Sequence, residues 1–449
     1  MSQYILNIDV PQFKKALDTL KSVVNTRMAL PILADVHLSY DRTEEMFRLM
    51  VSDSESWLTL DMAEMVEEGG EQVARKFVRL LKDDSKDHFS AVCIRYSDLR
   101  EAIASLPSQY VLEVTIDMDA LTMTVNYQIG HFVLPVERAD EFPQPIDVIM
   151  PTTDAYAQWR NRMNQAASDE ERSKIEAEWL SPKPVVRFTL GGDKLLRPMA
   201  QARCCCANDE LRPVMNAELL HITQEGITVV ASDGHTLFKE YLQLGIGFVS
   251  YAEFPADSSA RLLVPKTVLQ ALIAAFPSDK PLTITADTQR IEFLTQGARL
   301  VCRQIDGNYP NYDSVIPQNS PYKMVVSVAA LRGALRRIGL FANTSSNMAI
   351  IRCEEQSFVV SSSDLDFSKE GSERVPVQET DAFLPEGFQI GAKISALTQL
   401  LDLVPTENVL MFFSTPATAF LLKPEDVASS RVLMQMPMLI GESLPEQQE

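Results

Sequence analysis

Apolar positions predict a short amphipathic helix at three places in the chain. In "LREAIASLP" (99–107), "LQALIAAFP" (269–277) and "LTQLLDLVP" (397–405), a leucine is followed by an aliphatic residue four positions later and by an apolar residue just before proline. This spacing puts the apolar side chains on one face of a helix. The proline ends each helix because it has no amide hydrogen to donate. The shared rule indicates an internal repeat.

Other elements accompany each short helix in the same order. A β-like apolar run leads into a Ser-Asp turn, as in "VVASDGHTLFKE" (229–240), and alternating residues after the helix predict antiparallel hairpins. A longer amphipathic helix begins each repeat. The predicted longer helices span 11–27, 193–206 and 328–343, the turns 51–55, 231–235 and 362–367, and the hairpins 112–127, 282–296 and 408–423. The unit of helix, strands, turn, short helix and hairpin therefore occurs three times.

This threefold unit predicts an α+β fold of three repeated domains, each with two helices backed by antiparallel sheets. We place the domains at 1–148, 149–320 and 321–449, which suits a chain of 449 residues. Two charged segments interrupt the repeat, at about 62–90 and at about 153–180. We expect both to be additions on the surface, the second of them helical.

The distribution of charge changes the picture that the total charge gives. The chain carries a net charge of -20, which by itself argues against nucleic acid because phosphates bind basic surfaces. The six predicted helices nevertheless sum to +9, and basic pairs such as Lys14 and Lys21 or Arg332 and Arg336 share a helical face. Basic residues that only keep each helix soluble are the alternative. Because the rule holds in all three repeats, we favour a basic wall that faces phosphates.

Ser232, Asp233 and His235 lie within four residues of one another, which raises the alternative of a catalytic or metal site. The other four histidines have no spacing typical of metal ligands, and the chain has no phosphate-binding loop or nucleophile motif. The Ser-Asp pair also recurs in the other two turns without histidine. We therefore predict structural turns, held by hydrogen bonds to the aspartate side chain, and no catalytic residue.

Three of the six cysteines are adjacent, Cys204 to Cys206. Successive residues on a helix point about 100° apart, so the three cannot converge on one zinc ion, and we interpret them as small buried apolar side chains. We expect neither metal nor cofactor. The cysteine spacing fits a reducing cytoplasm, and the sequence shows no signal segment or apolar run long enough for a membrane span. We therefore expect a cytoplasmic protein without membrane contact.

Several segments carry a resemblance to a known family. "LRPVMNAELLHI" with "ITVVASDGHTLFKEYL", then "LLVPKTVLQALIAAFP" and "LVCRQIDGNYPNYDSVIP", are similar to the central domain of the bacterial DNA polymerase III β subunits, the sliding clamps. "LKSVVNTRMALPILADVHL" resembles the first domain of that family and "VLMQMPMLI" its C-terminal segment. The resemblance implies a homodimer closed head to tail into a ring, with helices lining the hole. It also implies a non-catalytic processivity factor of the replicative polymerase that encircles double-stranded DNA irrespective of sequence.

The resemblance further implies a hydrophobic pocket between the second and third domains, which binds a short peptide motif of polymerase, clamp loader and repair proteins. The matching residues are Arg212, Met215, Ser232, Gly234, His235, Thr236, Leu237, Pro310, Ser314, Val315, Lys393, Ala396, Met434, Gln435, Met436, Pro437, Met438, Leu439 and Ile440. Flexible methionines suit a site with several partners. The chain departs from the family at Thr236, Ser314 and Ala396 and continues past Ile440, so we expect an altered peptide preference.

Two further sets of residues complete the expected sites. The residues expected to face DNA are Lys14, Lys15, Lys21, Arg27, Lys194, Arg197, Arg203, Arg332, Arg336 and Arg337. The contact between the two chains is expected to set Phe132 and Leu134 of one against Leu340 and Phe341 of the other, all large and apolar as an interface core requires. Two alternatives stay open: a clamp-like paralogue of a phage or mobile element with other partners, and an interaction module that does not encircle DNA.

Overall fold

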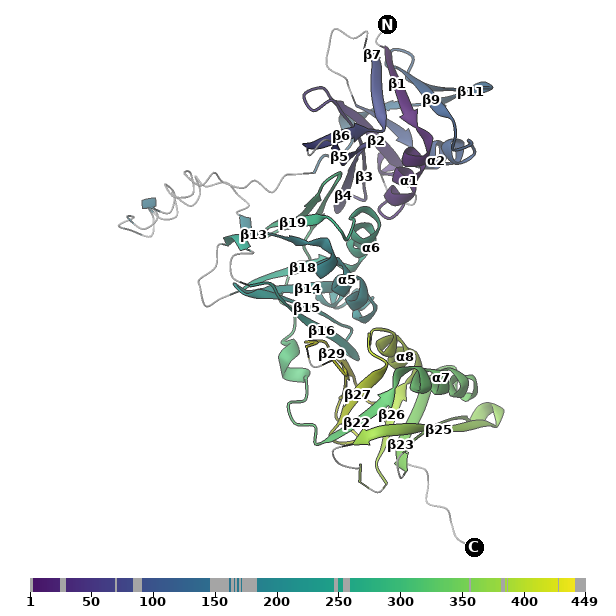
Figure 1. Ribbon diagram of the computed structural model, residues 1–449, viewed down its shortest axis with the longest axis vertical. Helices are drawn as coiled ribbons and strands as arrows, with labels where there is room; N and C mark the ends of the chain where they lie inside the picture. The colour runs from purple at the N-terminus through teal and green to yellow at the C-terminus, as the bar shows by residue number, and fades with distance from the viewer. Residues whose placement is uncertain are drawn as a thin grey trace. The chain divides into compact units, whose positions relative to one another are not determined.

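The computed structural model divides the chain into two compact units (Figure 1). Unit 1 comprises Met1–Ala200 and Gly245–Ile305, and unit 2 comprises Gln201–Leu244 and Asp306–Glu449. The residues that the structure describes are 3–24, 30–68, 71–83, 91–145, 161–162, 165, 168, 171, 184–245, 249–252, 259–354, 357–380, 384–385, 387–426 and 428–440. The limits of the three predicted domains, 1–148, 149–320 and 321–449, stay a prediction.

Unit 1 contains two large antiparallel sheets and a separate hairpin. The first sheet has the order β11-β10-β9-β1-β7, and the second the order β12-β8-β2-β3-β4-β21-β20-β19-β13-β17. The strands are β1 Gln3–Asp9, β2 Asp35–Asp41, β3 Met46–Ser52, β4 Ser56–Asp61, β5 Ala63–Glu68, β6 Glu71–Lys76, β7 Val78–Asp83, β8 Val92–Arg95, β9 Val111–Asp117, β10 Thr122–Tyr127, β11 Gly130–Pro135, β12 Glu137–Arg138, β13 Pro184–Gly191, β17 Val249–Ala252, β18 Ala260–Pro265, β19 Pro281–Asp287, β20 Arg290–Thr295 and β21 Ala298–Arg303. The pairing of β4 with β21 makes one continuous sheet from strands of the first and second repeats.

The helices of unit 1 form where the apolar stripes predicted them. They are α1 Val10–Leu20, α2 Tyr96–Ala104, α5 Gly192–Ala202, whose last two residues belong to unit 2, and α6 Lys266–Ala275. Helix α1 shows why the sequence is helical here: the Asp9 side chain accepts a hydrogen bond from the Gln12 amide at 3.1 Å, and Phe13, Leu17 and Leu20 are buried. The segment described after Leu20 is a turn, so the first helix is shorter than predicted.

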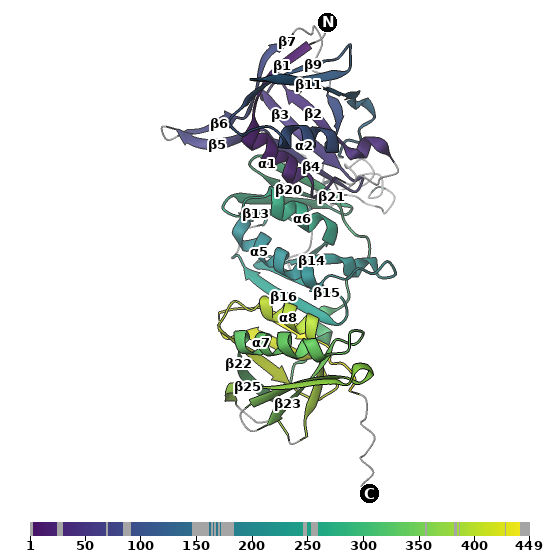
Figure 2. The same ribbon diagram turned by 90° about the vertical axis from the view of Figure 1, so that its right-hand side faces the viewer.

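Unit 2 is built on one run of antiparallel strands, in the order β14-β15-β16-β29-β28-β27-β22-β25-β24-β23-β26. The strands are β14 Ala217–Ile222, β15 Gly226–Ser232, β16 Thr236–Gln243, β22 Tyr322–Ser327, β23 Met348–Glu354, β24 Ser357–Asp364, β25 Lys369–Thr380, β26 Gln389–Lys393, β27 Asn408–Phe413, β28 Phe420–Pro424 and β29 Val432–Gln435. Helices α7 Val328–Ile338 and α8 Ile394–Asp402 pack against each other beside these strands (Figure 2). Here β16 pairs with β29, which joins strands of the second and third repeats.

The structure confirms the repeated order of helices, strands, turns and hairpins. The six predicted helices correspond to α1, α2, α5, α6, α7 and α8, and the predicted hairpins to β9–β10, β19–β20 and β27–β28. The segment 62–90 corrects one expectation. Strands β5 and β6 form a separate hairpin, but β7 pairs with β1, and Val78 is buried, so this part belongs to the first sheet rather than to a surface addition. Most of the expected insertion at 153–180 lies outside the described residues.

Candidate peptide-binding and DNA-facing sites

The Ser-Asp turns are held by their aspartates, as predicted. Asp233 Oδ1 accepts hydrogen bonds from the His235 amide at 2.9 Å, the Thr236 amide at 2.6 Å and the Thr236 hydroxyl at 3.0 Å. Gly234 has a φ of +88°, which a residue without a side chain adopts without strain. In the first repeat, Asp53 Oδ1 accepts the same set of bonds, from the Glu55 amide and from the amide and hydroxyl of Ser56. The cluster of Asp233 and His235 is therefore a turn that the fold uses repeatedly.

The turn between β15 and β16 meets the C-terminal strand and the residues after it. The Met436 amide donates to the His235 carbonyl at 2.7 Å, which extends the pairing of β16 with β29 by one bond. Further along, the Met438 amide donates to the Gly391 carbonyl at 2.9 Å, and Gln435 Nε2 donates to the Lys393 carbonyl at 3.2 Å. The C-terminal segment thus bridges the turn of the second repeat and strand β26 of the third.

The predicted pocket residues divide into an accessible set and a buried set. The buried ones, at most 9% exposed, are Met215, Ser232, Thr236, Leu237, Met434 and Gln435. The exposed ones are Arg212, Gly234, His235, Pro310, Ser314, Val315, Lys393, Met436 and Leu439, and the half-buried ones are Ala396, Pro437, Met438 and Ile440. Leu439, 92% exposed, and Val315, 51% exposed, offer the largest uncovered apolar side chains of this set. The buried members therefore expose little side-chain surface.

The loop that carries Pro310, Ser314 and Val315 is fixed to the strands of the second repeat. Tyr312 hydrogen-bonds His221 Nδ1 through its hydroxyl at 2.8 Å, and Lys239 pairs with Asp313. The loop therefore has a defined place beside the turn. Arg212 lies over that turn too: its Nη1 is 3.3 Å from where a side chain on Gly234 would begin, while its Nε donates to Asp209 at 2.8 Å.

Arg431 positions the C-terminal strand, although no pattern in the sequence indicates this role. The side chain is 4% exposed; it donates to Glu240 at 2.6 and 3.0 Å, to Gln201 Oε1 at 2.7 Å and to the Leu403 carbonyl. A buried guanidinium with its donors satisfied ties the start of β29 to both repeats. Glu218 is a second unforeseen residue: it is completely buried, burial raises its pKa, and its carboxylate has no hydrogen-bond partner among the described residues.

The basic residues expected to face DNA also fall into two groups. Lys14 donates to the carbonyls of Ala104 and Leu106 at the end of α2, Arg332 pairs with Asp402, and Arg337 pairs with Glu373. The side chains that make no hydrogen bond or ion pair to a described residue are those of Lys15, Lys21, Lys194, Arg197 and Arg336. Arg203 is half-buried with an unpaired Nε, and Arg27 lies outside the described residues. Lys14, Arg332 and Arg337 of the predicted set therefore already bind carbonyl or carboxylate groups of the chain.

Two of the four predicted contact residues lie on an edge strand, and the other two lie on the 3-10 turn Gly339–Phe341 that follows α7. Phe132 and Leu134 are half-buried on β11, which is the last strand of its sheet. In unit 2, Leu340 is 75% and Phe341 38% exposed, and the Phe341 ring lies 2.9 Å from where a side chain on Gly371 of β25 would begin. Strand β25 pairs with β24 along its whole first part but with β22 only from Val377 onward. The other edge of Lys369–Pro376 is therefore unpaired within the described chain.

All six cysteines are free, and Cys205 and Cys206 are buried as expected, whereas Cys204 is exposed. Among the residues described, no group of three or more histidine, cysteine, aspartate or glutamate side chains is arranged to hold a metal ion. The described helices include none that is long and apolar enough to cross a membrane.

The chain is similar in sequence and in fold to known proteins. The model of the DNA polymerase III beta subunit, central domain, matches residues 189–311, and the model of its C-terminal domain matches 313–438. The beta sliding clamp of Caulobacter vibrioides is 23% identical over 441 residues, which are 96% of this chain and 99% of that protein. The solved DNA polymerase sliding clamps of Pseudomonas aeruginosa (19% identity, 97% of this chain and 100% of that chain) and Bacillus subtilis (17%, 98% and 100%) each superpose with a TM-score of 0.76.

The fold, with its three sets of repeated elements, is that of the DNA clamps. Because the two family models together match more than half of the residues, the chain belongs to the bacterial DNA polymerase III beta subunit family, the beta sliding clamps. Its function is that of a DNA sliding clamp.

Proposed function

We propose that two copies of this chain close head to tail into a ring around double-stranded DNA and tether a replicative polymerase without catalysing any reaction themselves. The three domains, 1–148, 149–320 and 321–449, would be equivalent segments of that ring. Such a protein acts where the chromosome is copied, in the cytoplasm. The observation that carries the proposal is a strand pairing between successive repeats. It occurs twice within the chain, and the strands that would form a third such pairing, β11 and β25, each have an unpaired edge in the described chain.

The two pairings that join successive repeats use equivalent strands. Strand β4, which follows the Ser-Asp turn of the first repeat, pairs with β21, the strand after the hairpin β19–β20 of the second repeat. In the same way β16, which follows the turn of the second repeat, pairs with β29, the strand after the hairpin β27–β28 of the third repeat. In the third repeat the strand after the turn is β25, and in the first repeat the strand after the hairpin β9–β10 is β11. Both have an unpaired edge within the described chain. A partner chain that pairs its β11 with β25 satisfies both edges, and its own β25 then pairs with β11 of the first chain.

Apolar residues flank these two edges, which supports the same arrangement. Phe132 and Leu134 lie on β11 itself, and Leu340 and Phe341 lie next to β25. Leu340 exposes 75% of its surface, which a partner chain that pairs with β25 would cover. Pairing of backbone along the strands, with apolar side chains beside it, gives both direction and affinity to the contact.

The cations without described partners give the helices their proposed role toward DNA. Lys21 just after α1, Lys194 on α5 and Arg336 on α7 come from all three repeats. Contact with phosphates alone fixes no base sequence and so permits sliding. The strongly acidic remainder of a chain with a net charge of -20 would repel DNA from other surfaces.

The accessible residues around the β15–β16 turn are proposed to bind a short peptide of the polymerase, the clamp loader or repair proteins. His235, Arg212 and Lys393 supply polar groups, while Val315, Met436 and Leu439 supply apolar surface. Met436→Ala combined with Met438→Ala should abolish binding of the C-terminal peptide of the host's replicative polymerase in a fluorescence anisotropy titration. The dimer should stay intact in native mass spectrometry, because neither residue lies at the proposed ring edges. Unchanged peptide affinity would locate the site elsewhere.

Encirclement of DNA is tested by topology. The chain is loaded on a nicked circular plasmid by the clamp loader of its host with ATP, and the plasmid is then cut with a restriction enzyme. A ring should stay with the circle through gel filtration at high salt and leave within minutes once the ends are open. Retention that does not depend on a closed circle, or a stable monomer at micromolar concentration, would instead favour an interaction module. A ring that loads but binds no polymerase peptide would favour a clamp-like paralogue with other partners.

A further inference from the structure

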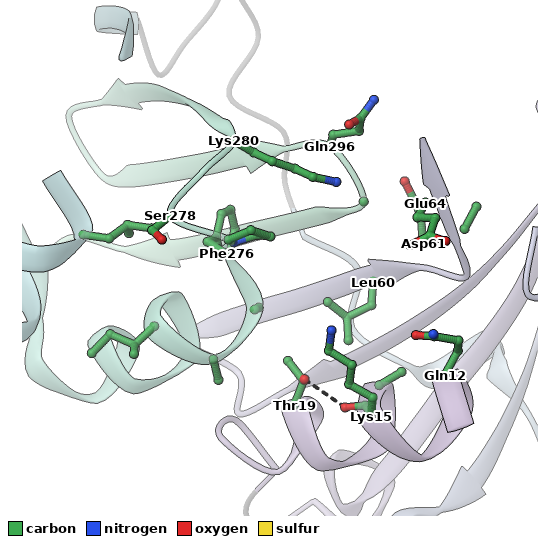
Figure 3. A pocket seen from close by; sticks show the side chains of 18 of the residues that line it. Gln12, Lys15, Thr19, Leu60, Asp61, Glu64, Phe276, Ser278, Lys280 and Gln296 are labelled. Atoms are coloured by element: carbon green, nitrogen blue, oxygen red, sulfur yellow. Dashed lines mark hydrogen bonds between the residues drawn. The ribbon is translucent and has the colours of Figure 1, made fainter. Parts of the chain in front are cut away.

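A cavity of about 600 Å³ lies within unit 1, and its lining residues belong neither to the proposed peptide site nor to strands β11 and β25 (Figure 3). It is bounded by helices α1, α5 and α6, by the ends of β4 and β5, and by the loop 277–280. Cavities of this size accommodate a small molecule or a short peptide segment. Ala63 and Glu64, which begin the hairpin β5–β6, line part of it, so the segment that interrupts the repeat builds one wall.

The floor of the cavity is aliphatic. Leu60, Leu196 and Ile273 line it together with several alanines of α1, α5 and α6. Ile273 is 47% exposed although it lies on the second short amphipathic helix, where the repeat pattern predicts a covered apolar position. An aliphatic side chain placed against Ile273 would remove this surface from water, which stabilises a complex by about 25 cal/mol for each Å² covered.

Three cations surround this floor, and the side chain of each makes no hydrogen bond or ion pair to any described residue: Lys15, Arg197 and Lys280. Figure 3 shows the side chains of Lys15 and Lys280 extending into the cavity from different walls. The two acidic side chains in the lining already have partners. Asp61 accepts from Arg48 at 2.9 Å, and Glu64 is 3.6 Å from Arg75. The cavity therefore offers unneutralised positive charge to a ligand.

The walls are fixed before any ligand binds. The Gly192 amide donates to the Lys280 carbonyl at 2.9 Å, and a side chain on Gly192 would begin only 2.9 Å from the Pro277 carbonyl oxygen, so this loop packs directly on backbone. On the opposite side the Asp61 amide donates to the Gly297 carbonyl at 3.0 Å. A preformed site loses little conformational entropy on binding, which favours affinity for a short ligand.

We propose that this cavity binds a short acidic peptide segment of a partner protein. One aliphatic side chain of the segment would lie against Ile273, and its carboxylates would face Lys15, Arg197 and Lys280. Duplex DNA fits less well, since its phosphates need protruding cations rather than a concave aliphatic floor. A flipped or single-stranded base is disfavoured as well, because stacking needs an open aromatic face and Phe276 in the lining is only 4% exposed.

The test uses the full chain and a fluorescein-labelled, end-capped peptide of sequence Glu-Asp-Leu-Glu-Asp-Leu, followed by fluorescence anisotropy at low salt. We expect saturable binding with a Kd below about 1 mM, the weak range typical of so short a ligand. Lys280→Glu should weaken binding by about tenfold or more, since it replaces an attraction by a repulsion. Ile273→Ser should weaken it by about fivefold without any change in charge, because it removes the apolar surface.

Arg261→Glu is the matched control, since Arg261 is exposed, belongs to unit 1 and does not line the cavity. It should leave the Kd within about twofold of the parent at the same ionic strength. Three results would overturn the proposal: no saturation up to millimolar peptide, an equal loss in Arg261→Glu, or an Ile273→Ser variant that binds as the parent does. A twelve-base-pair duplex whose binding falls with Lys280→Glu, and which the peptide does not displace, would make the cavity part of the DNA surface and likewise overturn it.

Discussion

Removal of the Asp233 carboxylate separates the structural from the binding role of its turn. In Asp233→Ala the amides of His235 and Thr236 and the Thr236 hydroxyl lose their acceptor, at distances of 2.9, 2.6 and 3.0 Å. Hydrogen bonds to a charged group contribute about 1.5 to 3 kcal/mol each, but the half-exposed aspartate lets water replace part of that. We take about 2 kcal/mol as the local cost. The turn that presents His235 to the C-terminal segment should then open about thirtyfold more often.

Hydrogen exchange measured by mass spectrometry on peptides covering 230–237 reports this opening directly, as a protection factor about thirtyfold lower. Because the Met436 amide donates to the His235 carbonyl, protection should also fall at Met436, and the polymerase peptide should bind more weakly. Asp53→Ala is the matched control. Its carboxylate accepts the same three kinds of bond from Glu55 and Ser56 in unit 1, so it should lose local protection equally and keep full peptide affinity.

Two outcomes would refute this reasoning. If Asp233→Ala loses protection at the turn but binds the peptide as tightly as the parent, the turn is not part of the peptide site. If neither variant loses protection, the aspartates do not hold the turns, and the repeated Ser-Asp pattern needs another cause. Loss of peptide binding in both variants would indicate a general destabilisation rather than a local one.

Three other changes test separate parts of the molecule. Leu340→Asp should convert the dimer into a folded monomer in native mass spectrometry, because a residue 75% exposed in the single chain matters little to its fold; a persistent dimer would contradict the proposed edge pairing. Lys21→Glu with Lys194→Glu should weaken DNA binding and flatten its salt dependence, by about 0.9 in the logarithmic slope for each phosphate that the protein no longer neutralises, and an unchanged slope would remove these residues from the DNA surface. Burial lowers the pKa of His37 to about 4, so the fold should lose up to about 3 kcal/mol as the pH falls from about 6.5 to about 4, where the unfolded histidine is protonated and the native one is not. Urea unfolding at pH 7 and pH 4.5 measures this loss, which should be much smaller in His37→Gln; an equal loss in both proteins would assign it to other groups.

The elements were predictable where a local pattern decides them. Phe13, Leu17 and Leu20 recur at helical spacing, and the aspartate of each turn bonds to amides two and three residues away, so neighbours along the chain suffice. Strand β7 was missed because "VRLLKD" shows no alternation that separates it from the charged segment around it. Its place is fixed by pairing with β1 some seventy residues earlier, a pairing that no local window contains.

For the proposed peptide site, the sequence names residues but does not show which of them a ligand can reach. The resemblance brought Leu237 and Met434 into the pocket together with Met436 and Leu439, yet the first two are buried where β16 pairs with β29. Alternation along a strand decides which residues a ligand can reach, and its phase is set by the partner strand. Arg431 was missed for a related reason. The groups that accept its hydrogen bonds lie on Glu240, Gln201 and Leu403, which are far apart in the sequence.

Charge shows most clearly what sequence spacing leaves open. Lys14 and Lys21 share a helical face, and both counted equally toward a basic wall, but Lys14 is bound to the carbonyls that end α2 while Lys21 is not paired to any described residue. Arg337 is likewise held by Glu373, at 2.9 Å from its Nε. A cation with a carboxylate partner attracts phosphate less and must break that pair to contact it. Lys21→Gln should therefore cost more DNA affinity than Arg337→Gln, although spacing along the helices assigns the two residues the same role.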